Sequence, residues 1–260
     1  MSVLSEKLAA AKAEGRYALV GYLPVGYPSV DTSIEAMVAM VEGGCDVIEV
    51  GVPYSDPVMD GPTIQAAAEP AVRAGVGIVD ALRAVKAVSD AGAAAVVMSY
   101  WNPIERYGVA RFAADLASAG GSGAITPDLI PEEAAEWIAA ADAHDLDKVF
   151  LVAPSSTDAR IRATADASRG FVYAAAVMGV TGARTTVSDA AETLVRRTRD
   201  AGTGIPVCVG LGVSNHDQAA HIGAYADGVI VGSAFVRCLL DNPNADGVAA
   251  VRELARGLRG

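Results

Sequence analysis

Positions 48–64 of the chain read Ile48-Glu49-Val50-Gly51-Val52-Pro53-Tyr54-Ser55-Asp56-Pro57-Val58-Met59-Asp60-Gly61-Pro62-Thr63-Ile64. The first part is a short apolar run that contains Glu49, and the second part is a loop punctuated by glycine and proline. A continuous apolar run of this length is typical of a strand buried on both faces of a parallel sheet. Such a sheet needs helices on both of its faces, so the stretch predicts an α/β fold.

The same kind of apolar run recurs along the whole chain, and Ala/Glu/Arg-rich segments with helical spacing lie between the runs. Eight runs are predicted to be strands: 17–22, 46–50, 94–99, 123–126, 148–153, 171–177, 205–209 and 228–231. Eight strands that alternate with helices in 260 residues predict a (β/α)8 TIM barrel. We see no linker or change of composition, so we expect one domain that spans residues 1–260.

A doubly wound open sheet is the alternative architecture for alternating strands and helices. Folds of that class often carry a GxGxxG turn directly after the first strand, where it binds a dinucleotide. Here the first predicted strand is followed by Leu23-Pro24-Val25-Gly26-Tyr27-Pro28, which lacks that fingerprint. The barrel is therefore the favoured prediction.

Composition narrows the possible partners. The net charge of −11 and the pI near 4.7 argue against nucleic acid and against an anionic membrane surface. No window has the long apolar run of a membrane span, and residues 1–15 lack the apolar core of a signal peptide. We therefore expect a cytoplasmic protein.

The cysteines and histidines form no recognisable metal or disulfide pattern. Cys45, Cys208 and Cys238 are odd in number and widely spaced, so we expect reduced thiols rather than bridges. The three histidines have neither HxxxH nor HExxH spacing, and we expect them at the surface. The sequence therefore predicts no metal site.

Two acidic residues of the opening stretch are candidates for acid/base chemistry. Glu49 lies inside an apolar run without a strand-end cation near it, and burial is expected to raise its pKa towards neutrality. Asp60 lies on a more solvated loop and is expected to stay ionised. Two carboxylates with separated pKa values are a known acid/base arrangement. Taken alone, Asp60 also fits a simple Asp-Gly-Pro turn.

In a TIM barrel, the active site lies at the C-terminal ends of the strands. Besides Glu49 and Asp60, the candidates near those ends are Tyr22, Tyr100 and Tyr173. Tyr173 alone also fits a packed core aromatic.

The loops after the seventh and eighth predicted strands are rich in glycine. Barrels often bind phosphate at these loops through backbone N–H groups and a helix N-terminus. The residues that would do so are Gly210, Gly212, Gly232 and Ser233, with Gly182 and Arg184 as possible additions from the sixth loop. Each glycine alone fits a tight turn and Ser233 alone fits a helix N-cap, but their coincidence favours an anion site.

Several of these segments together resemble the tryptophan synthase alpha chain family. The most specific is the run from Ile48 to Ile64, and the resemblance extends along the whole length of the chain. It includes Asn102-Pro103-Ile104, Thr126-Pro127-Asp128-Leu129, Gly179-Val180-Thr181-Gly182, Gly210-Leu211-Gly212-Val213 and Gly232-Ser233-Ala234. The family fold is the same barrel that the periodicity predicts.

The resemblance implies a lyase that cleaves indole-3-glycerol phosphate to indole and glyceraldehyde 3-phosphate by a retro-aldol reaction. It implies a catalytic set of Glu49, Asp60 and Tyr173. In this set Glu49 transfers protons, Asp60 accepts the indole N–H, and Tyr173 shapes the pocket and holds Glu49. The residues implied in binding the substrate and its phosphate are Tyr22, Tyr100, Thr181, Gly182, Gly210, Gly212, Gly232 and Ser233.

The resemblance also implies a partner. The family works in an α2β2 complex, in which the beta chain carries pyridoxal phosphate and joins indole to serine. No cofactor is expected on the alpha chain itself. The loops 53–60 and 179–187 are implied in closure and partner contact, with Pro53 and Asp56 at the interface.

Two other functions fit the same fold. One is another barrel enzyme for a phosphorylated sugar, such as an isomerase, which has no need of the spacing between Glu49 and Asp60. The other is a subunit that only binds and activates a beta chain, which would tolerate loss of either carboxylate. Release of indole from indole-3-glycerol phosphate, with and without a beta chain, distinguishes these possibilities.

Overall fold

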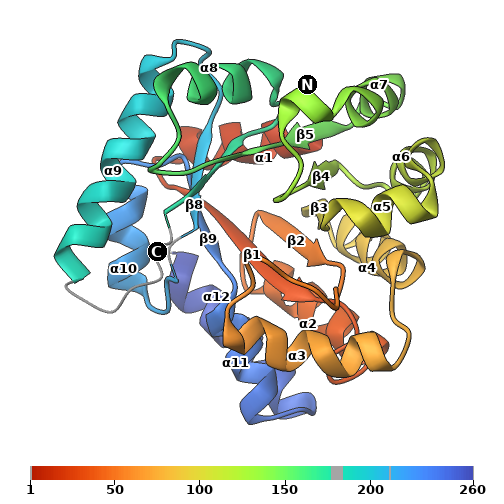
Figure 1. Cartoon of the computed structure of the whole chain (residues 1–260). Helices are drawn as coiled ribbons and strands as arrows, with labels where there is room; N and C mark the ends of the chain where they lie inside the picture. Colours follow the sequence, from red (N-terminus) through yellow and green to blue (C-terminus); the bar gives the residue numbers. More distant parts are fainter. Residues whose placement is uncertain (1, 177–183, 211, 260) are drawn as a thin grey trace.

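The computed structural model describes residues 2–176, 184–210 and 212–259, without the side chains of 184–188. It confirms the predicted barrel, in which the strands surround a central axis and the helices lie outside (Figure 1). All strand pairs are parallel, in the order β5-β4-β3-β2-β1-β9-β8-β7-β6. The strands are β1 (Ala18–Pro24), β2 (Val47–Gly51), β3 (Ala94–Met98), β4 (Gly123–Ile125), β5 (Asp147–Val149), β6 (Leu151–Val152), β7 (Val172–Ala175), β8 (Val207–Gly210) and β9 (Gly228–Val231).

The fifth predicted strand appears as two short pieces, β5 and β6, on either side of Phe150. β5 pairs with β4 and β6 pairs with β7, so this one segment joins the two ends of the sheet. The carbonyl of Phe150 accepts a hydrogen bond from the N–H of Tyr173 at 3.1 Å. The nine short strands therefore occupy the eight strand positions of the prediction.

Helices follow the strands and cover the outer face of the barrel (Figure 1). The segment between β2 and β3 is long because it carries a loop and two helices. The α-helices are α1 (Val3–Ala13), α2 (Val30–Glu42), α3 (Pro62–Arg73), α4 (Ile78–Asp90), α5 (Trp101–Tyr107), α6 (Val109–Ser118), α7 (Ala135–Ala143), α8 (Asp158–Ala167), α9 (Arg184–Asp200), α10 (His216–Gly223), α11 (Ser233–Asp241) and α12 (Ala245–Arg259), with a 3-10 turn at Pro131–Glu133.

The apolar core has two layers. The larger layer lies between the sheet and the outer helices, and the smaller one fills the inside of the barrel. Leu4, Leu8 and Ala11 of α1 belong to the inner layer, so α1 closes the N-terminal end of the barrel. The opposite end carries the loops that follow the strands, and the site must therefore open there.

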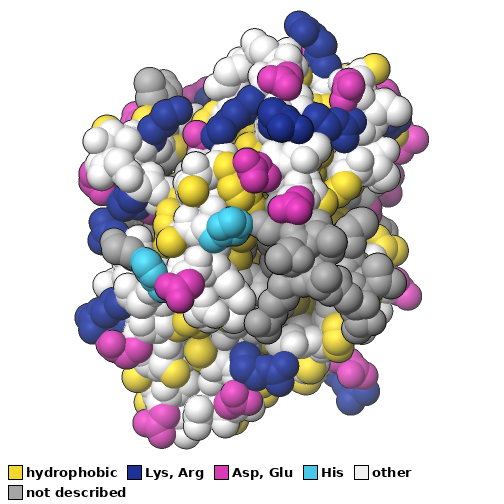
Figure 2. Space-filling model, turned by 90° about the vertical axis from the view of Figure 1, so that its left-hand side faces the viewer, with side chains coloured by type: hydrophobic (Ala, Val, Ile, Leu, Met, Phe, Trp, Pro, Cys, Tyr) yellow, Lys and Arg dark blue, Asp and Glu magenta, His cyan; other side chains and the backbone are white. Residues whose placement is uncertain are grey.

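The surface carries charges of both signs close together. Figure 2 shows basic side chains along the upper part of the face formed by α8, α9 and α10, with acidic side chains directly beside them. Ion pairs of this region include Arg197–Asp158 at 2.7 Å and Arg162–Asp166 at 3.7 Å.

The histidines and cysteines lie as the sequence predicted. His144, His216 and His221 are exposed, and the three cysteines are free thiols. Among the described residues, no helix is both long and apolar enough to span a bilayer.

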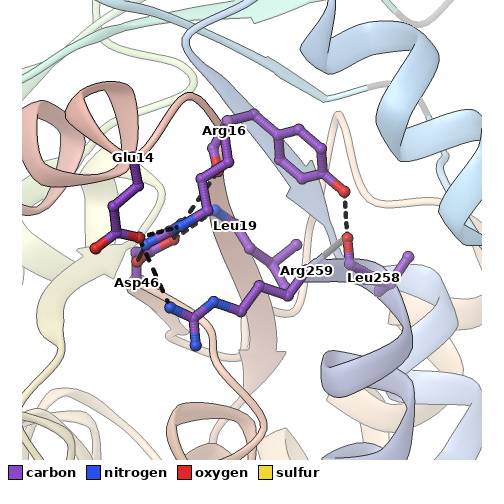
Figure 3. A network of polar contacts seen from close by, with 7 residues as sticks. Glu14, Arg16, Leu19, Asp46, Leu258 and Arg259 are labelled. Carbon is purple, nitrogen blue, oxygen red and sulfur yellow. Dashed lines mark hydrogen bonds and ion pairs between the residues drawn. The ribbon is translucent and has the colours of Figure 1, made fainter.

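A polar network ties the starts of β1 and β2 together at the closed end of the barrel (Figure 3). Arg16 donates to both oxygens of Asp46, at 2.6 Å and 2.9 Å, and the same carboxylate accepts the N–H of Leu19. The side chains of Arg16 and Asp46 are 15% and 10% exposed, so solvent screens this pair little. The pair therefore helps to hold neighbouring strands in register.

Replacing Asp46 by Asn should test this contribution. The Asp46→Asn variant leaves the largely buried Arg16 with Glu14, whose side chain is 56% exposed, as its remaining ion-pair partner in this network. We therefore expect the free energy of unfolding in urea to fall by about 2 kcal/mol, the range of a hydrogen bond between charged groups. The matched control is Asp31→Asn, which breaks the exposed pair of Arg83 and Asp31 and should cost less than about 0.5 kcal/mol. Equal losses in the two variants would show that the buried pair has no special role.

Candidate active site

A cavity of about 300 Å³ opens at the C-terminal end of the barrel. It is formed by residues from the ends of β1, β2, β3, β7, β8 and β9 and by the loop that follows β2. The residues of the sequence prediction that line it are Tyr22, Glu49, Asp60, Tyr173, Gly210, Gly212, Gly232 and Ser233. Residues that are far apart in the sequence thus meet at one place.

Glu49 lies at the base of this cavity. Val47 belongs to the inner core layer, and Glu49 follows it by two residues, so both side chains point into the barrel. The residue is only 1% exposed, and this burial raises the pKa of its carboxyl to about 8. Its Oε1 atom has no hydrogen-bond partner among the described residues. Lys148 pairs instead with Asp142 at the other end of the barrel. Glu49 is therefore largely protonated at neutral pH.

Asp60 lies on the loop between β2 and α3, at the side of the cavity. Burial raises the pKa of its carboxyl, and a hydrogen bond from the Tyr100 hydroxyl opposes that rise. The side chain of Gln65 donates to the Asp60 carbonyl at 2.7 Å and fixes the loop. As the sequence predicted, Asp60 is more exposed than Glu49, but the loop still half-buries it beside the cavity.

Two tyrosines share the cavity with these carboxylates, and glycines make room for both rings. A Cβ atom at Gly51 would lie 2.6 Å from the Tyr22 hydroxyl, and one at Gly210 would lie 2.5 Å from the Tyr173 hydroxyl. Burial, followed by the nearby carboxylates, raises the pKa of both phenols well above the ordinary value. Both tyrosines are therefore neutral groups at physiological pH.

The ends of β8 and β9 form the part of the cavity that is suited to an anion. Gly212 has φ = 65° and its Cβ direction is open, so the backbone there is accessible to a ligand. Gly232 is the N-cap of α11 and Ser233 is its first residue, so Ser233 is not itself the N-cap. The free N–H groups of that helix start are suited to a negative charge.

Some predicted residues lie elsewhere. Thr181 and Gly182 lie outside the described residues. Tyr100 does not line the cavity but lies behind Asp60, to which it is hydrogen-bonded. Pro53 is buried and Asp56 is exposed, so of these two only Asp56 is accessible to a partner.

The sequence interpretation missed the apolar wall of the cavity, which consists of Met59, Ile64, Met98, Ala175 and Ile230. The alternation along the strands is a signal that could have found part of it. Met98 follows the inward-facing Val96 by two residues, and Ala175 follows Tyr173 by two. This wall is suited to a flat apolar group.

The cavity therefore combines a protonated buried acid, a second carboxylate, an apolar wall and an anion-binding end. Such an arrangement can protonate an apolar ring, accept a hydrogen bond from it and hold a phosphate at a fixed distance from it. Among the described residues, no group of three or more His, Cys, Asp or Glu side chains is placed to bind a metal.

Comparison with known proteins identifies the family of the chain. The family model described as "Tryptophan synthase alpha chain" matches residues 8–258. The alpha chain of Thermobifida fusca (strain YX) is 62% identical, with 100% of this chain and 98% of the relative covered. That of Mycobacterium avium (strain 104) is 61% identical, with 96% and 92% covered.

Solved structures give the same result. The structure of tryptophan synthase from M. tuberculosis in its aminoacrylate-bound form contains a chain that is 56% identical. It superposes with a TM-score of 0.90 over 100% of both chains. The alpha subunit from Legionella pneumophila str. Paris is 30% identical, with a TM-score of 0.89 over 100% of this chain and 97% of that one. The predicted family is thus confirmed, and the chain belongs to the tryptophan synthase alpha chain family.

Proposed function

We propose that this chain cleaves indole-3-glycerol phosphate to indole and glyceraldehyde 3-phosphate, as the alpha subunit of tryptophan synthase. The family is a carbon–carbon lyase family of tryptophan biosynthesis. The observation that carries the assignment is a buried Glu49 with a pKa near 8, which shares one cavity with Asp60. A retro-aldol cleavage of this substrate needs an acid and a base of that kind.

The proposed chemistry begins with proton transfer from the Glu49 carboxyl to C3 of the indole ring. The ring nitrogen gains positive character, and the Asp60 carboxylate accepts its N–H and stabilises that charge. The resulting Glu49 carboxylate then removes the proton from the hydroxyl on the carbon next to the ring. That carbon becomes the aldehyde, its bond to C3 breaks, and the bonding electrons restore the aromatic ring. Glu49 is protonated again at the end.

The remaining parts of the cavity bind and orient the substrate. The wall of Met59, Ile64, Met98, Ala175 and Ile230 contacts the indole ring. The backbone at Gly210, Gly212 and Gly232, with the Ser233 hydroxyl, holds the phosphate, and we assign Thr181 and Gly182 to the same end. Tyr22 and Tyr173 lie between the two ends and limit the position of the glycerol chain.

These steps are proton transfers and one bond cleavage, so the proposed reaction uses no cofactor on this chain. We propose a cytoplasmic α2β2 complex in which a beta chain carries pyridoxal phosphate and condenses the released indole with serine. Support comes from the likeness to a chain in structures of M. tuberculosis tryptophan synthase. The exposed Asp56 is the residue of the β2 loop that we assign to partner contact.

Replacement of Glu49 by Gln tests the proton transfer directly. We expect Glu49→Gln to lower indole release by about 10²–10⁴-fold, because the amide cannot give or take the proton. Binding of glyceraldehyde 3-phosphate, measured by calorimetry, should stay close to wild type. A variant that keeps a large part of the wild-type rate would remove Glu49 from the mechanism.

Stability provides the control for this variant. The folded-state pKa of Glu49 lies above its value in the unfolded chain, so this carboxyl destabilises the fold increasingly as the pH rises from about 4.5 to 8. A glutamine side chain does not ionise, so it does not destabilise the fold in this pH-dependent way. The Glu49→Gln variant should therefore be more stable than wild type at pH 7, by about 3 kcal/mol, and the two should converge below pH 4.

The glycine at position 212 tests the phosphate site. We expect Gly212→Val to weaken the substrate and glyceraldehyde 3-phosphate alike, because a side chain occupies the space where the backbone meets the anion. The matched control is Gly204→Val. Gly204 has φ = 70° and an open Cβ direction, like Gly212, but it lies before β8, at the other end of the barrel. If both variants bind glyceraldehyde 3-phosphate equally well, the phosphate lies elsewhere.

The partner is tested at Asp56. We expect a beta chain to raise the lyase rate by about tenfold or more, within the usual range of coupling between sites. Asp56→Ala should reduce this activation more than it reduces the rate of the isolated chain, because Asp56 is exposed and does not line the cavity. Asp90→Ala removes a similarly exposed acid at the end of α4 and should leave activation unchanged. Equal fractional losses with and without the beta chain would assign Asp56 to the chemistry or the fold.

A further inference from the structure

We propose that Tyr100 is a positioning residue of the lyase, whose hydroxyl holds the Asp60 carboxylate in place at the side of the cavity. This inference rests on the proposed function, because it concerns the residue to which that function gives the indole N–H. Tyr100 itself does not line the cavity, so it acts through Asp60 and not on the substrate.

The hydroxyl of Tyr100 has two partners on the β2 loop. It accepts a hydrogen bond from the N–H of Met59 at 3.0 Å and donates one to Oδ1 of Asp60 at 3.3 Å. The first bond uses the oxygen lone pair, which leaves the hydroxyl proton for the carboxylate. The bond to Asp60 is long, as hydrogen bonds of catalytic groups often are before a substrate binds. One hydroxyl thus fixes both the backbone and the side chain of this loop.

Tyr100 is itself firmly held. It is 5% exposed and occupies the N-cap position of α5, two residues after the end of β3. Its ring packs on that of Tyr54, with the centroids 5.0 Å apart and an angle of 31° between the planes. The Asn102 side chain donates to the Tyr54 hydroxyl at 3.2 Å. The N–H of Trp101 donates to Asp128 at 2.9 Å. Tyr100, which is held at the end of the barrel, therefore fixes the position of Asp60 on the neighbouring loop.

The contact also affects the charge state of Asp60. Burial raises the pKa of the Tyr100 hydroxyl to about 12, so it remains a proton donor throughout the physiological range. Its hydrogen bond lowers the pKa of Asp60, against the effect of burial. The other titratable groups of the described chain that face Asp60 are Glu49, Tyr22 and Tyr173, from β2, β1 and β7. Of all these groups, Tyr100 is the one hydrogen-bonded to the Asp60 side chain.

The Tyr100→Phe variant removes the hydroxyl and keeps the ring contact with Tyr54. Loss of a hydrogen bond to a charged group predicts a drop in kcat/KM of about tenfold to a hundredfold. Without that bond the pKa of Asp60 rises, so Asp60 is protonated at higher pH. The acid limb of the pH profile of kcat/KM should therefore move to higher pH, which a merely structural defect would not produce.

Two further variants complete the test. Tyr107→Phe is the matched control, since Tyr107 also donates to an aspartate, Asp115, at 2.6 Å, but away from the cavity. It should leave kcat/KM and its pH profile unchanged. In an Asp60→Asn background, Tyr100→Phe should cause little additional loss, because both changes remove one interaction. An unmoved acid limb in Tyr100→Phe, or losses that multiply in the double variant, would overturn the proposal.

A measurement without turnover separates this inference from the proposed function. Carbon NMR of the Asp60 carboxyl, assigned with Asp60→Asn, should show a higher pKa in Tyr100→Phe than in wild type or Tyr107→Phe. If the wild-type chain released no indole but this shift were present, the proposed reaction would fail and the positioning of Asp60 would stand. An unchanged Asp60 titration, in a chain that does release indole, would reject the role of Tyr100 alone.

Discussion

Glu49 is buried inside the barrel, and no cation lies beside it among the side chains that the structure describes. This burial is the constraint on which the rest of the site depends. A charged carboxylate at that position would lack both water and a counter-ion, so the group holds its proton to a pKa of about 8. Glu49 is buried because β2 is a central strand, with β1 and β3 paired to its two sides. A proton held in this way is available for an apolar ring at neutral pH.

The rest of the cavity is arranged around that group by the register of the sheet. Tyr22 lies directly opposite Glu49 on β1, and its ring fits only because Gly51 has no side chain. Tyr173 and Gly210 repeat the same relation between β7 and β8. Each large tyrosine ring thus lies against a glycine of the neighbouring strand, which has no side chain to collide with it. The cavity lies between these rings and the other residues that line it. Such pairing explains glycines that have no role in a turn.

Asp60 depends on a different kind of support. It lies on a loop, where a side chain has many conformations, yet the proposed chemistry needs it at a fixed place beside the ring. Contacts from the end of β3, through Tyr100 and Tyr54, reduce that freedom. Because Asp56 is exposed on the same loop, a partner that docks there can act on Asp60 through a short stretch of chain.

The sequence by itself determined the architecture, the family and the buried acid, because these depend on local or repeated patterns. Apolar runs predict strands, and helical spacing predicts helices. A strand of a parallel barrel is covered on both faces, so an acid within such a run is buried whatever the position of its strand in the sheet. Only the tertiary structure decided that Asp60 is half-buried, that Pro53 is covered and that Tyr100 lies behind Asp60. It also selected Met98 and Ile230 for the cavity wall. These features join residues from different strands and loops, and such contacts follow from the closure and register of the barrel, which no local pattern contains.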